Sequence, residues 1–443
     1  MKKSKKIAIA FAASLSILTA PTAFLDAPQY LAPAVAHAEN EVPPPVVETD
    51  LGTPLPIRTY MVYSCPEWAT EKRHFSGIVI DGPEAENYRS LRIAFEGYDV
   101  DAADVGNEEG PDIIESLYVH RADSLAVSFA ESRAAYGGGM RGRFAVVGQN
   151  YDTATGTELT WDDVFVSKNI VANELAMLLS RNYAGESFVT GNVLDLAAKV
   201  KAILDEGGCS WTLDPCGATF YFNMLSLSED PYAPIYTASL TFDVNGFCFK
   251  EKYRHAPEQW CMEIEPRTPM RVFLGDSILN TIEVKGDVNG IQIIRGGVAA
   301  TGSDGIRDKA ETVFTDSVRS NGIHPVLVKM RDGRKYLYVD TLIAPTPEDY
   351  EKGYDAQKMA ELENRHELRV YDLSGDEIRR VECDGNFTMK NEFIHEESVP
   401  KEWFVMTDPE NFKLNVTGVP LRESHRRCRV GADGAPEIIE AIQ

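Results

Sequence analysis

The sequence lacks the short cysteine and histidine motifs from which common metal and redox sites are built. It contains no CxxC pair, and its eight histidines show no HExxH, HxH or HxxxH spacing. These absences give no support to a zinc ribbon, to a thioredoxin-type thiol pair or to a histidine-built metal site. No segment repeats at a fixed period either, so a solenoid or a propeller is not indicated.

Basic residues are scarce relative to acidic ones, with 44 Lys and Arg against 68 Asp and Glu and a net charge of −24. This composition argues against a nucleic-acid partner, because binding phosphates requires a basic surface. The first 38 residues carry four lysines and one aspartate, so the net charge without them falls to −27. Such acidity favours solubility, and it would steer encounter with a cationic partner.

Long apolar runs are absent after residue 20, and the run before it, residues 7–20, has only 14 residues. Four lysines precede this run, and the small-x-small site Ala36-His37-Ala38 follows it. This order is typical of a secretory signal peptide, and the run is too short to span a bilayer comfortably. We therefore expect a signal peptide at residues 1–38, cleaved near Ala38, and export to an extracellular, periplasmic or cell-envelope location with no transmembrane segment in the mature chain.

Seven cysteines lie beyond the signal region, and disulfides are the first interpretation of cysteines in an exported protein. Two pairs are close enough in sequence to staple local loops or hairpins, and a third pair is separated by a longer stretch. These pairs are Cys209/Cys216, Cys248/Cys261 and Cys383/Cys428, with Cys65 left over.

The hydrophobic pattern indicates two helices among many short strands, after a Pro-rich, acidic linker at residues 39–56. One helix follows Ser167 as its N-cap, and the other follows Asn192 and stops at Gly207. Their expected core faces are Val171, Leu175, Leu178 and Leu179 in the first helix and Val193, Leu196, Ala197, Val200 and Leu204 in the second. The expected strands are RTYMVYS, FSGIVI, SLRIAF, SLYVH, DSLAVSF, RFAVVGQNY, ATFYFNML, YTASLTFDV, FCFKEKYR, MRVFLG, NTIEVKG, GIQIIRGG, PVLVKM, RKYLYVDTLIA, ELRVYDL and FKLNVT.

The stretch EPRTPM, residues 265–270, suggests a domain boundary. We expect an α+β domain at residues 57–265, in which two helices pack on an antiparallel sheet, and a mainly β domain at residues 266–443. The tetrapeptide Asp-Val-Asn-Gly at 243–246 and 287–290 predicts a hairpin turn at both places. The charged stretch 346–366 is either an exposed helix or a long excursion.

The sequence Gly275-Asp276-Ser277 ends a strand-like run, which is how one group of serine esterases presents its nucleophile before a helix. Such an enzyme also needs a histidine base, usually in an Asp-x-x-His near the C-terminus. No Asp-x-x-His follows Ser277, and the nearest imitations are Glu363-x-x-His366 and Glu392-x-x-His395. The residues after Ser277 alternate like a hairpin, so we expect a strand, a tight turn and a strand, with an exported serine esterase as the alternative.

Two further segments were considered as sites. Residues 137–142, GGGMRG, match GxGxxG, but a strand-like run follows where a dinucleotide fold requires a helix. The acidic stretch 98–112 could offer oxygen ligands to calcium around Asp99–Asp104, although it fails the EF-hand pattern. We assign no catalytic, cofactor-binding or metal-binding residue from the sequence.

The segment from about residue 117 to 244 resembles the extracellular domain family of the lysozyme-sensing anti-sigma factor RsiV, which is also appended to some peptidoglycan deacetylases. Its order is an RADS-to-SF strand, a glycine loop, a TG hairpin with a helix entry, two helices and a GxxFYF strand. The matching residues are Asp152, Thr155, Gly156, Leu159, Asp163 and Phe165 in the middle motif, and Gly217, Phe220, Tyr221 and Phe222 in the last. Met140 departs from the family, which usually has a histidine there, and only six residues precede the apolar run, so the sigma-binding segment is missing.

The matching residues turn hairpins, fill a core or cap a helix, so they specify a fold and not an active site. The resemblance itself implies a fold used for recognition. The expected function is therefore that of a secreted, non-catalytic recognition or cell-envelope-associated protein of unknown ligand. Its partner would be a cationic protein such as lysozyme, or a cell-wall polymer. The alternative function is an exported serine esterase that uses Ser277.

Overall fold

The computed structural model describes most of the chain beyond the linker, and all described residues belong to the compact unit Glu48–Gln443. The described residues are 52–64, 73–80, 83–96, 112–136, 143–189, 191–223, 225–230, 233–266, 270–273, 278–299, 311–355, 358–359, 362, 365–383, 387–391, 401–419 and 421–441. None of the helices within these ranges is long and apolar enough to cross a lipid bilayer.

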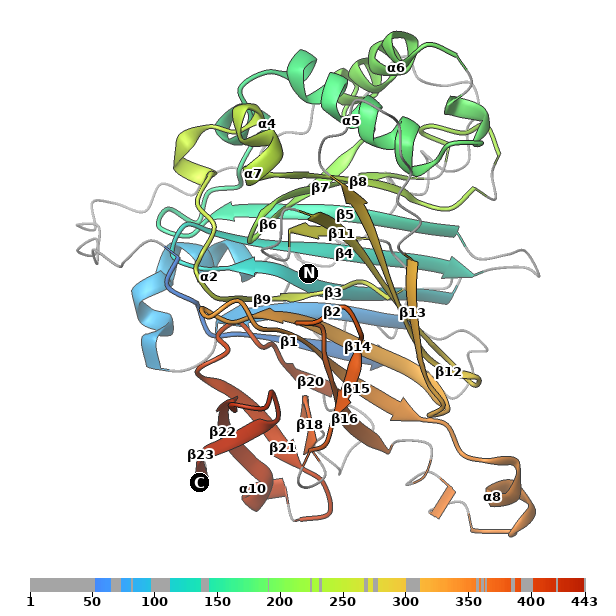
Figure 1. The fold of residues 1–443 in the computed structure, drawn as a ribbon. Coiled ribbons are helices and arrows are strands. Elements are labelled where there is room, and N and C mark those ends of the chain that lie inside the picture. The colour runs from blue at the N-terminus through green and yellow to red at the C-terminus, as the bar shows by residue number, and fades with distance from the viewer. Residues whose placement is uncertain are drawn as a thin grey trace. The chain divides into compact units, whose positions relative to one another are not determined.

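The largest described sheet has seven strands in the order β19-β20-β1-β2-β3-β4-β5. Its strands are β1 (Ile57–Ser64), β2 (Arg73–Ile80), β3 (Asp112–Ala122), β4 (Ala126–Tyr136), β5 (Arg143–Asp152), β19 (Lys390–Asn391) and β20 (Lys401–Phe404). Neighbouring strands are antiparallel except β2 and β3, which pair in parallel. Because β20 pairs with β1, strands from opposite ends of the chain lie side by side in this sheet (Figure 1).

Two helices, α5 (Lys168–Asn182) and α6 (Val193–Asp205), pack on a second sheet of three strands, β6-β7-β8 (Figure 1). These strands are β6 (Ser210–Asp214), β7 (Gly217–Phe222) and β8 (Tyr236–Thr241). Alternate side chains of a strand point to opposite faces, so Ala218, Phe220 and Phe222 join the core under the helices. Thr219 and Tyr221 point to the other face, which is also buried.

Three further sheets contain most of the remaining chain. The first has the order β17-β16-β15-β14-β9, the second β10-β11-β12-β13 and the third β18-β21-β22-β23. Their strands are β9 (Trp260–Glu263), β10 (Met270–Phe273), β11 (Ile278–Asp287), β12 (Gly290–Ala299), β13 (Glu311–Asp316), β14 (Ser320–Lys329), β15 (Lys335–Ile343), β16 (His366–Asp372), β17 (Arg379–Val381), β18 (Phe387–Thr388), β21 (Phe412–Val416), β22 (His425–Val430) and β23 (Pro436–Ala441).

The protein therefore has an α+β fold with a mainly β second part, as the sequence predicted. Described strands from both sides of residue 266 share sheets, since β9 pairs with β14 and β20 pairs with β1. The division into domains at residues 57–265 and 266–443 stays a prediction.

Both predicted helices are present, and their core faces are confirmed except at Val193, which is exposed. The side chain of Asn192 caps α6 by accepting a hydrogen bond from the backbone N–H of Leu194 at 3.1 Å. Ser167 precedes α5 as predicted, but its side chain makes no capping hydrogen bond. Gly207 follows α6 with a φ of +71°, the left-handed conformation that a glycine favours at a helix end.

Three predictions of local structure were wrong. SLRIAF lies in the helix α2 (Arg89–Phe95), where Leu91 and Phe95 are both buried at a spacing of one helical turn. FCFKEKYR forms two short 3-10 helices, Gly246–Cys248 and Glu251–Tyr253. The first Asp-Val-Asn-Gly lies at the end of α7 (Phe242–Asn245), since Gly246 has a φ of −54° rather than the positive φ that a tight hairpin turn requires.

The second Asp-Val-Asn-Gly closes a hairpin as predicted, because Asp287 pairs with Gly290 between β11 and β12. β10 and β11 also pair antiparallel, and β11 begins at Ile278, where an esterase nucleophile would be followed by a helix. Ser277 itself lies outside the described residues. In the charged stretch 346–366, α8 (Pro347–Glu351) is a short helix that Thr346 caps, and Lys358, Met359 and Leu362 are also helical.

None of the three predicted disulfides is present in the structure. The six described cysteines are thiols, and Cys65 lies outside the described residues. Cys248 packs in the core under the helices, whereas Cys261 packs in the core around β14 and β15, so closeness in sequence does not bring them together. Burial raises the pKa of the Cys248 thiol to about 12, which keeps it protonated and unreactive at neutral pH.

Candidate functional site

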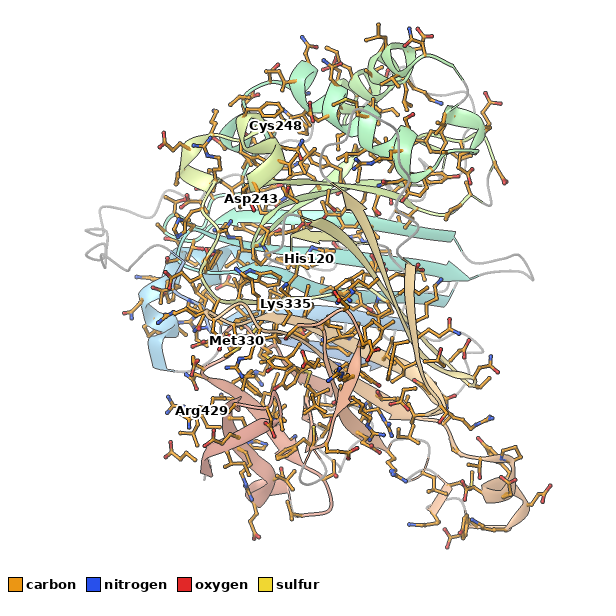
Figure 2. The ribbon with its side chains drawn as sticks, viewed as in Figure 1. His120, Asp243, Cys248, Met330, Lys335 and Arg429 are labelled. Carbon is orange, nitrogen blue, oxygen red and sulfur yellow. The ribbon has the colours of Figure 1, made fainter. Side chains whose placement is uncertain are left out.

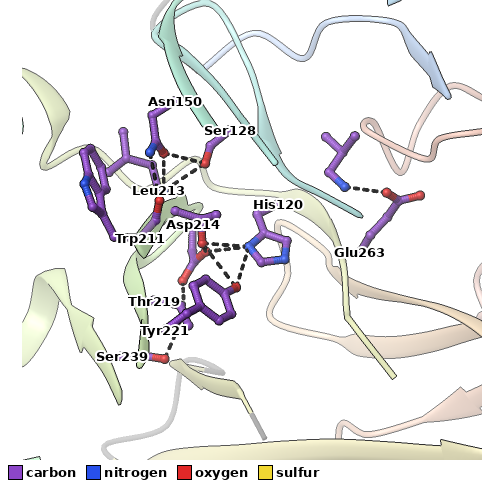
Figure 3. Close-up of polar contacts among 12 residues, drawn as sticks. His120, Ser128, Asn150, Trp211, Leu213, Asp214, Thr219, Tyr221, Ser239 and Glu263 are labelled. Atoms are coloured by element: carbon purple, nitrogen blue, oxygen red, sulfur yellow. Dashed lines mark hydrogen bonds and ion pairs between the residues drawn. The ribbon is translucent and has the colours of Figure 1, made fainter. Parts of the chain in front are cut away.

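A buried polar network connects β3 to the polar face of the three-stranded sheet (Figure 3). His120 of β3 is fully buried, and its Nδ1 lies 2.9 Å from the hydroxyl of Thr212 and 3.3 Å from a carboxylate oxygen of Asp214. The Tyr221 hydroxyl lies 3.4 Å from the same Nδ1. The alternation of β6 and β7 places these three partners together, because their apolar neighbours face the helices.

The network extends in two directions from its centre. The Thr219 hydroxyl donates to the second oxygen of Asp214 at 2.6 Å, and Ser239 of β8 lies 2.9 Å from Thr219. On the other side, the backbone N–H of Leu213 lies 2.9 Å from both Ser128 Oγ and Asn150 Oδ1. Side chains of β4 and β5 thus bond to the backbone of β6 and hold the two sheets together.

The chemistry of this network indicates a structural role. General acid–base catalysis requires a group within reach of a substrate, whereas His120 and Tyr221 are fully buried. Burial, followed by the charge of Asp214, raises the pKa of Tyr221 well above its usual value, so the phenol stays neutral. His120 Nε2 has no hydrogen-bond partner among the described residues.

A second polar cluster attaches β20 to the sheet of β14 to β16. Glu263 of β9 is fully buried; one carboxylate oxygen accepts from the backbone N–H of Val119 and the other lies 2.5 Å from His324 Nε2. The imidazole of His324 stacks between Trp403 at 4.7 Å and Tyr118 at 5.9 Å, measured between ring centroids. Burial alone would lower the pKa of His324, but the charge and hydrogen bond of Glu263 raise it above its usual value.

Trp403 also contacts a second histidine, His366, which is paired with Asp340. His366 Nδ1 lies 2.6 Å from Asp340, and its Nε2 lies 3.1 Å from the Lys390 ammonium group. The rings of His366 and Trp403 meet edge to face at 5.7 Å. Burial would raise the pKa of Asp340, but the hydrogen bond and charge of His366, with further hydrogen bonds, lower it below its usual value.

Sequence reasoning missed both polar clusters. Their partners are far apart in the sequence, with 144 positions between Val119 and Glu263 and 61 between Glu263 and His324. A single histidine or glutamate in a strand carries no local signal of such a partner. The only available hint was the presence of polar residues at alternate positions in strands whose other positions are apolar.

The clearest surface feature is a group of exposed apolar side chains where α5 meets α7, which we call the α5–α7 face. Its five members are 39% to 54% exposed: Val166, Ile170, Met177, Val244 and Phe247. The two segments lie side by side, since the Val166 N–H donates to the carbonyl of Cys248 at 2.9 Å. Figure 2 labels Asp243 of α7 and Cys248, the residue whose carbonyl accepts from Val166.

Three carboxylates accompany the α5–α7 face without an ion pair among the described residues. Asp162 and Asp243 are exposed, and the Lys250 ammonium group donates to the backbone carbonyl of Asp162 rather than to its carboxylate. Glu174 accepts a hydrogen bond from Asn245 at 2.8 Å, which joins α5 to α7, and burial raises the pKa of its carboxyl group. The neighbouring Lys168 points away, toward the carbonyl of Leu204 at the end of α6.

The sequence predicted the middle motif, from Asp152 to Phe165, but not the α5–α7 face. Residues of the middle motif have the expected local roles: Gly156 turns the hairpin with a φ of +66°, and the Asp163 carboxylate accepts from Thr160 before the short helix α4 (Trp161–Val164). Leu159 and Phe165 are buried in the core, as expected. The missed signal is that Ile170 and Met177 are apolar although they lie off the core face of α5.

The last motif also has the expected structural role. Phe220, Tyr221 and Phe222 are fully buried in β7, and a Cβ on Gly217 would lie 1.9 Å from the Leu240 carbonyl oxygen. Only glycine therefore fits at position 217.

Other candidate sites lie outside the described residues. These are Ser277, the glycine loop 137–142 with Met140, and the acidic segment around Asp99–Asp104. Among the residues that the structure does describe, no group of three or more His, Cys, Asp or Glu side chains is arranged to hold a metal ion.

Comparison with known proteins gives only distant structural likenesses. No family model and no curated protein matches the chain. A DUF3298 family member from Bacteroides fragilis NCTC 9343 is 14% identical, with a TM-score of 0.34, over 46% of this chain and 96% of that chain. A DUF3298 family protein from Pseudomonas aeruginosa PAO1 is 15% identical, with a TM-score of 0.28, over 46% of this chain and 97% of that one.

Proposed function

We propose that this is an exported, non-catalytic recognition protein that binds a cationic protein through the α5–α7 face. The observation that carries the proposal is the combination at this face of five exposed apolar side chains with the carboxylates of Asp162, Asp243 and Glu174, which form no ion pair among the described residues. Grouped apolar side chains on a surface are typical of interaction sites. Unpaired carboxylates beside them favour a basic partner.

The energetics of the face suit a partner that combines charge with an apolar anchor. Complete burial of a large apolar side chain contributes about 1.5–3 kcal/mol, and Phe247 and Met177 are each about half exposed before binding. The net charge of −27 of the chain without residues 1–38 would increase the rate of encounter with a basic protein, while the apolar contacts would slow dissociation.

Lysozyme is the cationic protein that the resemblance to the RsiV extracellular family brings forward. The export of the chain, through a signal peptide at residues 1–38 and a linker at 39–56, belongs to the same proposal. It would place the α5–α7 face where a secreted lysozyme or another basic protein of the envelope could reach it.

The experiment is retention of the mature chain on lysozyme-coated beads at low and at physiological salt. We expect retention of the wild type, and a loss of most of it in Phe247→Ser. The matched control is Ile439→Ser, because Ile439 is 49% exposed on β23, away from the α5–α7 face, and should leave retention unchanged. Failure of the wild type to be retained at either salt would overturn the lysozyme proposal.

A further inference from the structure

A small, partly open cavity lies where five segments of the described chain meet. Its volume is about 20 Å³. It is lined by residues that precede β1, by the end of β3, by Pro215 between β6 and β7, by residues at the start of β9 and by Thr407, which follows β20. A volume of about 10–15 Å³ is enough to hold one water molecule.

Two buried N–H donors on the lining of this cavity lack a hydrogen-bond partner among the described residues. Arg121 is 1% exposed; its Nε donates to Asp123 at 2.8 Å and its Nη2 to the carbonyl of His255 at 3.1 Å, but its Nη1 has no partner. Trp260 is 3% exposed, and its indole Nε1 also has no partner. A buried donor without a hydrogen-bond partner destabilises the folded state.

The one acidic side chain on the lining, Asp123, is already engaged. One carboxylate oxygen of Asp123 accepts from the N–H groups of Leu125 and Ala126, and the other accepts from Arg121. Two lining residues from different elements therefore each carry a donor without a described partner, and the lining has no uncommitted acidic group. A ligand that fits this lining must be small and must accept hydrogen bonds.

We propose that the cavity is a binding site for one small hydrogen-bond acceptor, a water molecule or a halide ion, held by Arg121 and Trp260. Water and halide ions both accept hydrogen bonds, which is what the two N–H donors require. The bound acceptor joins the end of β3 to the start of β9, and it lies against the chain at Gly52 and Pro54, just before β1. The bound acceptor thus helps to attach the segment before β1 to the segment that contains β9.

The test is a crystal structure of the mature chain, with crystals grown in parallel from chloride and from bromide. We expect one density peak within hydrogen-bonding distance of Arg121 Nη1 and Trp260 Nε1. An anomalous signal from bromide at this peak identifies a halide, and a peak without that signal identifies water. A cavity with no peak in either crystal form would overturn the proposal.

A pair of variants separates the proposed contact from a general effect of changing a tryptophan. Trp260→Phe removes one of the two donors, and we expect the peak to lose most of its occupancy. Trp161→Phe removes another indole Nε1 that lacks a partner, but Trp161 does not line this cavity, so the peak should persist. An equal peak in all three proteins would show that Trp260 does not hold the ligand.

Discussion

The two faces of the three-stranded sheet β6-β7-β8 are both buried, yet they are built from opposite chemistry. The face under α5 and α6 is apolar and draws on residues from one continuous stretch of about 130 positions. The other face carries Thr212, Asp214, Thr219 and Tyr221, which meet His120 of β3. An apolar face needs only shape and volume, whereas a buried polar face needs each partner in place.

The polar cluster around Trp403 follows the second pattern over longer distances. It joins β3, β9, β14 and β20 through Glu263 and His324, and its groups have low exposure. Loss of one member leaves the others buried without a partner. We therefore expect substitutions on the apolar face to lower the free energy of unfolding by graded amounts. Substitutions in the polar clusters should lower it more for each atom changed.

The largest effect is expected from Phe220→Ala on the apolar face. Phe220 is fully buried, and its ring lies 5.4 Å from Phe165 and 5.8 Å from Trp161. The cavity left behind should lower the free energy of unfolding by about 4 kcal/mol, measured by urea denaturation. Phe247→Ala is the control, because Phe247 is exposed and its loss should change stability little. Equal losses in both variants would contradict the assignment of the core.

A somewhat smaller effect is expected from Glu263→Gln, which changes few atoms. The amide keeps an acceptor for Val119 but removes the charge opposite His324, at an expected cost of about 3 kcal/mol in the free energy of unfolding. Glu437→Gln, in the exposed pair with Arg429, is the matched control and should change stability little. If both substitutions were equally mild, the polar cluster would not hold the sheets together.

The pH dependence of stability sharpens the same comparison. The pKa of His324 is raised above its usual value of 6.5 in the folded protein. The stability that its protonation contributes is fully present below pH 6.5 and is lost as the pH rises through the folded pKa. The advantage of the wild type over His324→Gln in free energy of unfolding should therefore be larger at pH 6 than at pH 9. A pH-independent advantage would mean that the imidazole is not charged in this cluster.

The smallest effect is expected at the helix ends on the apolar side. Asn192→Ala removes the hydrogen bond to the Leu194 N–H and should lower the free energy of unfolding by about 1 kcal/mol. Ser167→Ala is the matched variant, and it should cost less because the Ser167 side chain makes no capping hydrogen bond. The reverse order would contradict the capping geometry.

The sequence predicted the parts of the fold that depend on local patterns. The helical period and the caps located α5 and α6, and Asn289-Gly290 located a hairpin. Local patterns failed where tertiary packing decided, as in α2, where alternating and helical spacings both fit Leu91 and Phe95. The polar clusters and the α5–α7 face could not be predicted from local patterns. The residues next to Glu263 in the sequence do not indicate its distant partner, and those next to Met177 do not indicate that its side chain is exposed.

The most direct test of the proposed recognition role is a hydrogen-exchange footprint of the mature chain with and without lysozyme. The account predicts slower amide exchange, on binding, in peptides that cover residues 166–177 and 243–248, with little change in the peptides of β22 and β23. Protection confined to other segments, or no protection at a saturating lysozyme concentration, would contradict the assignment of the α5–α7 face as the site of recognition.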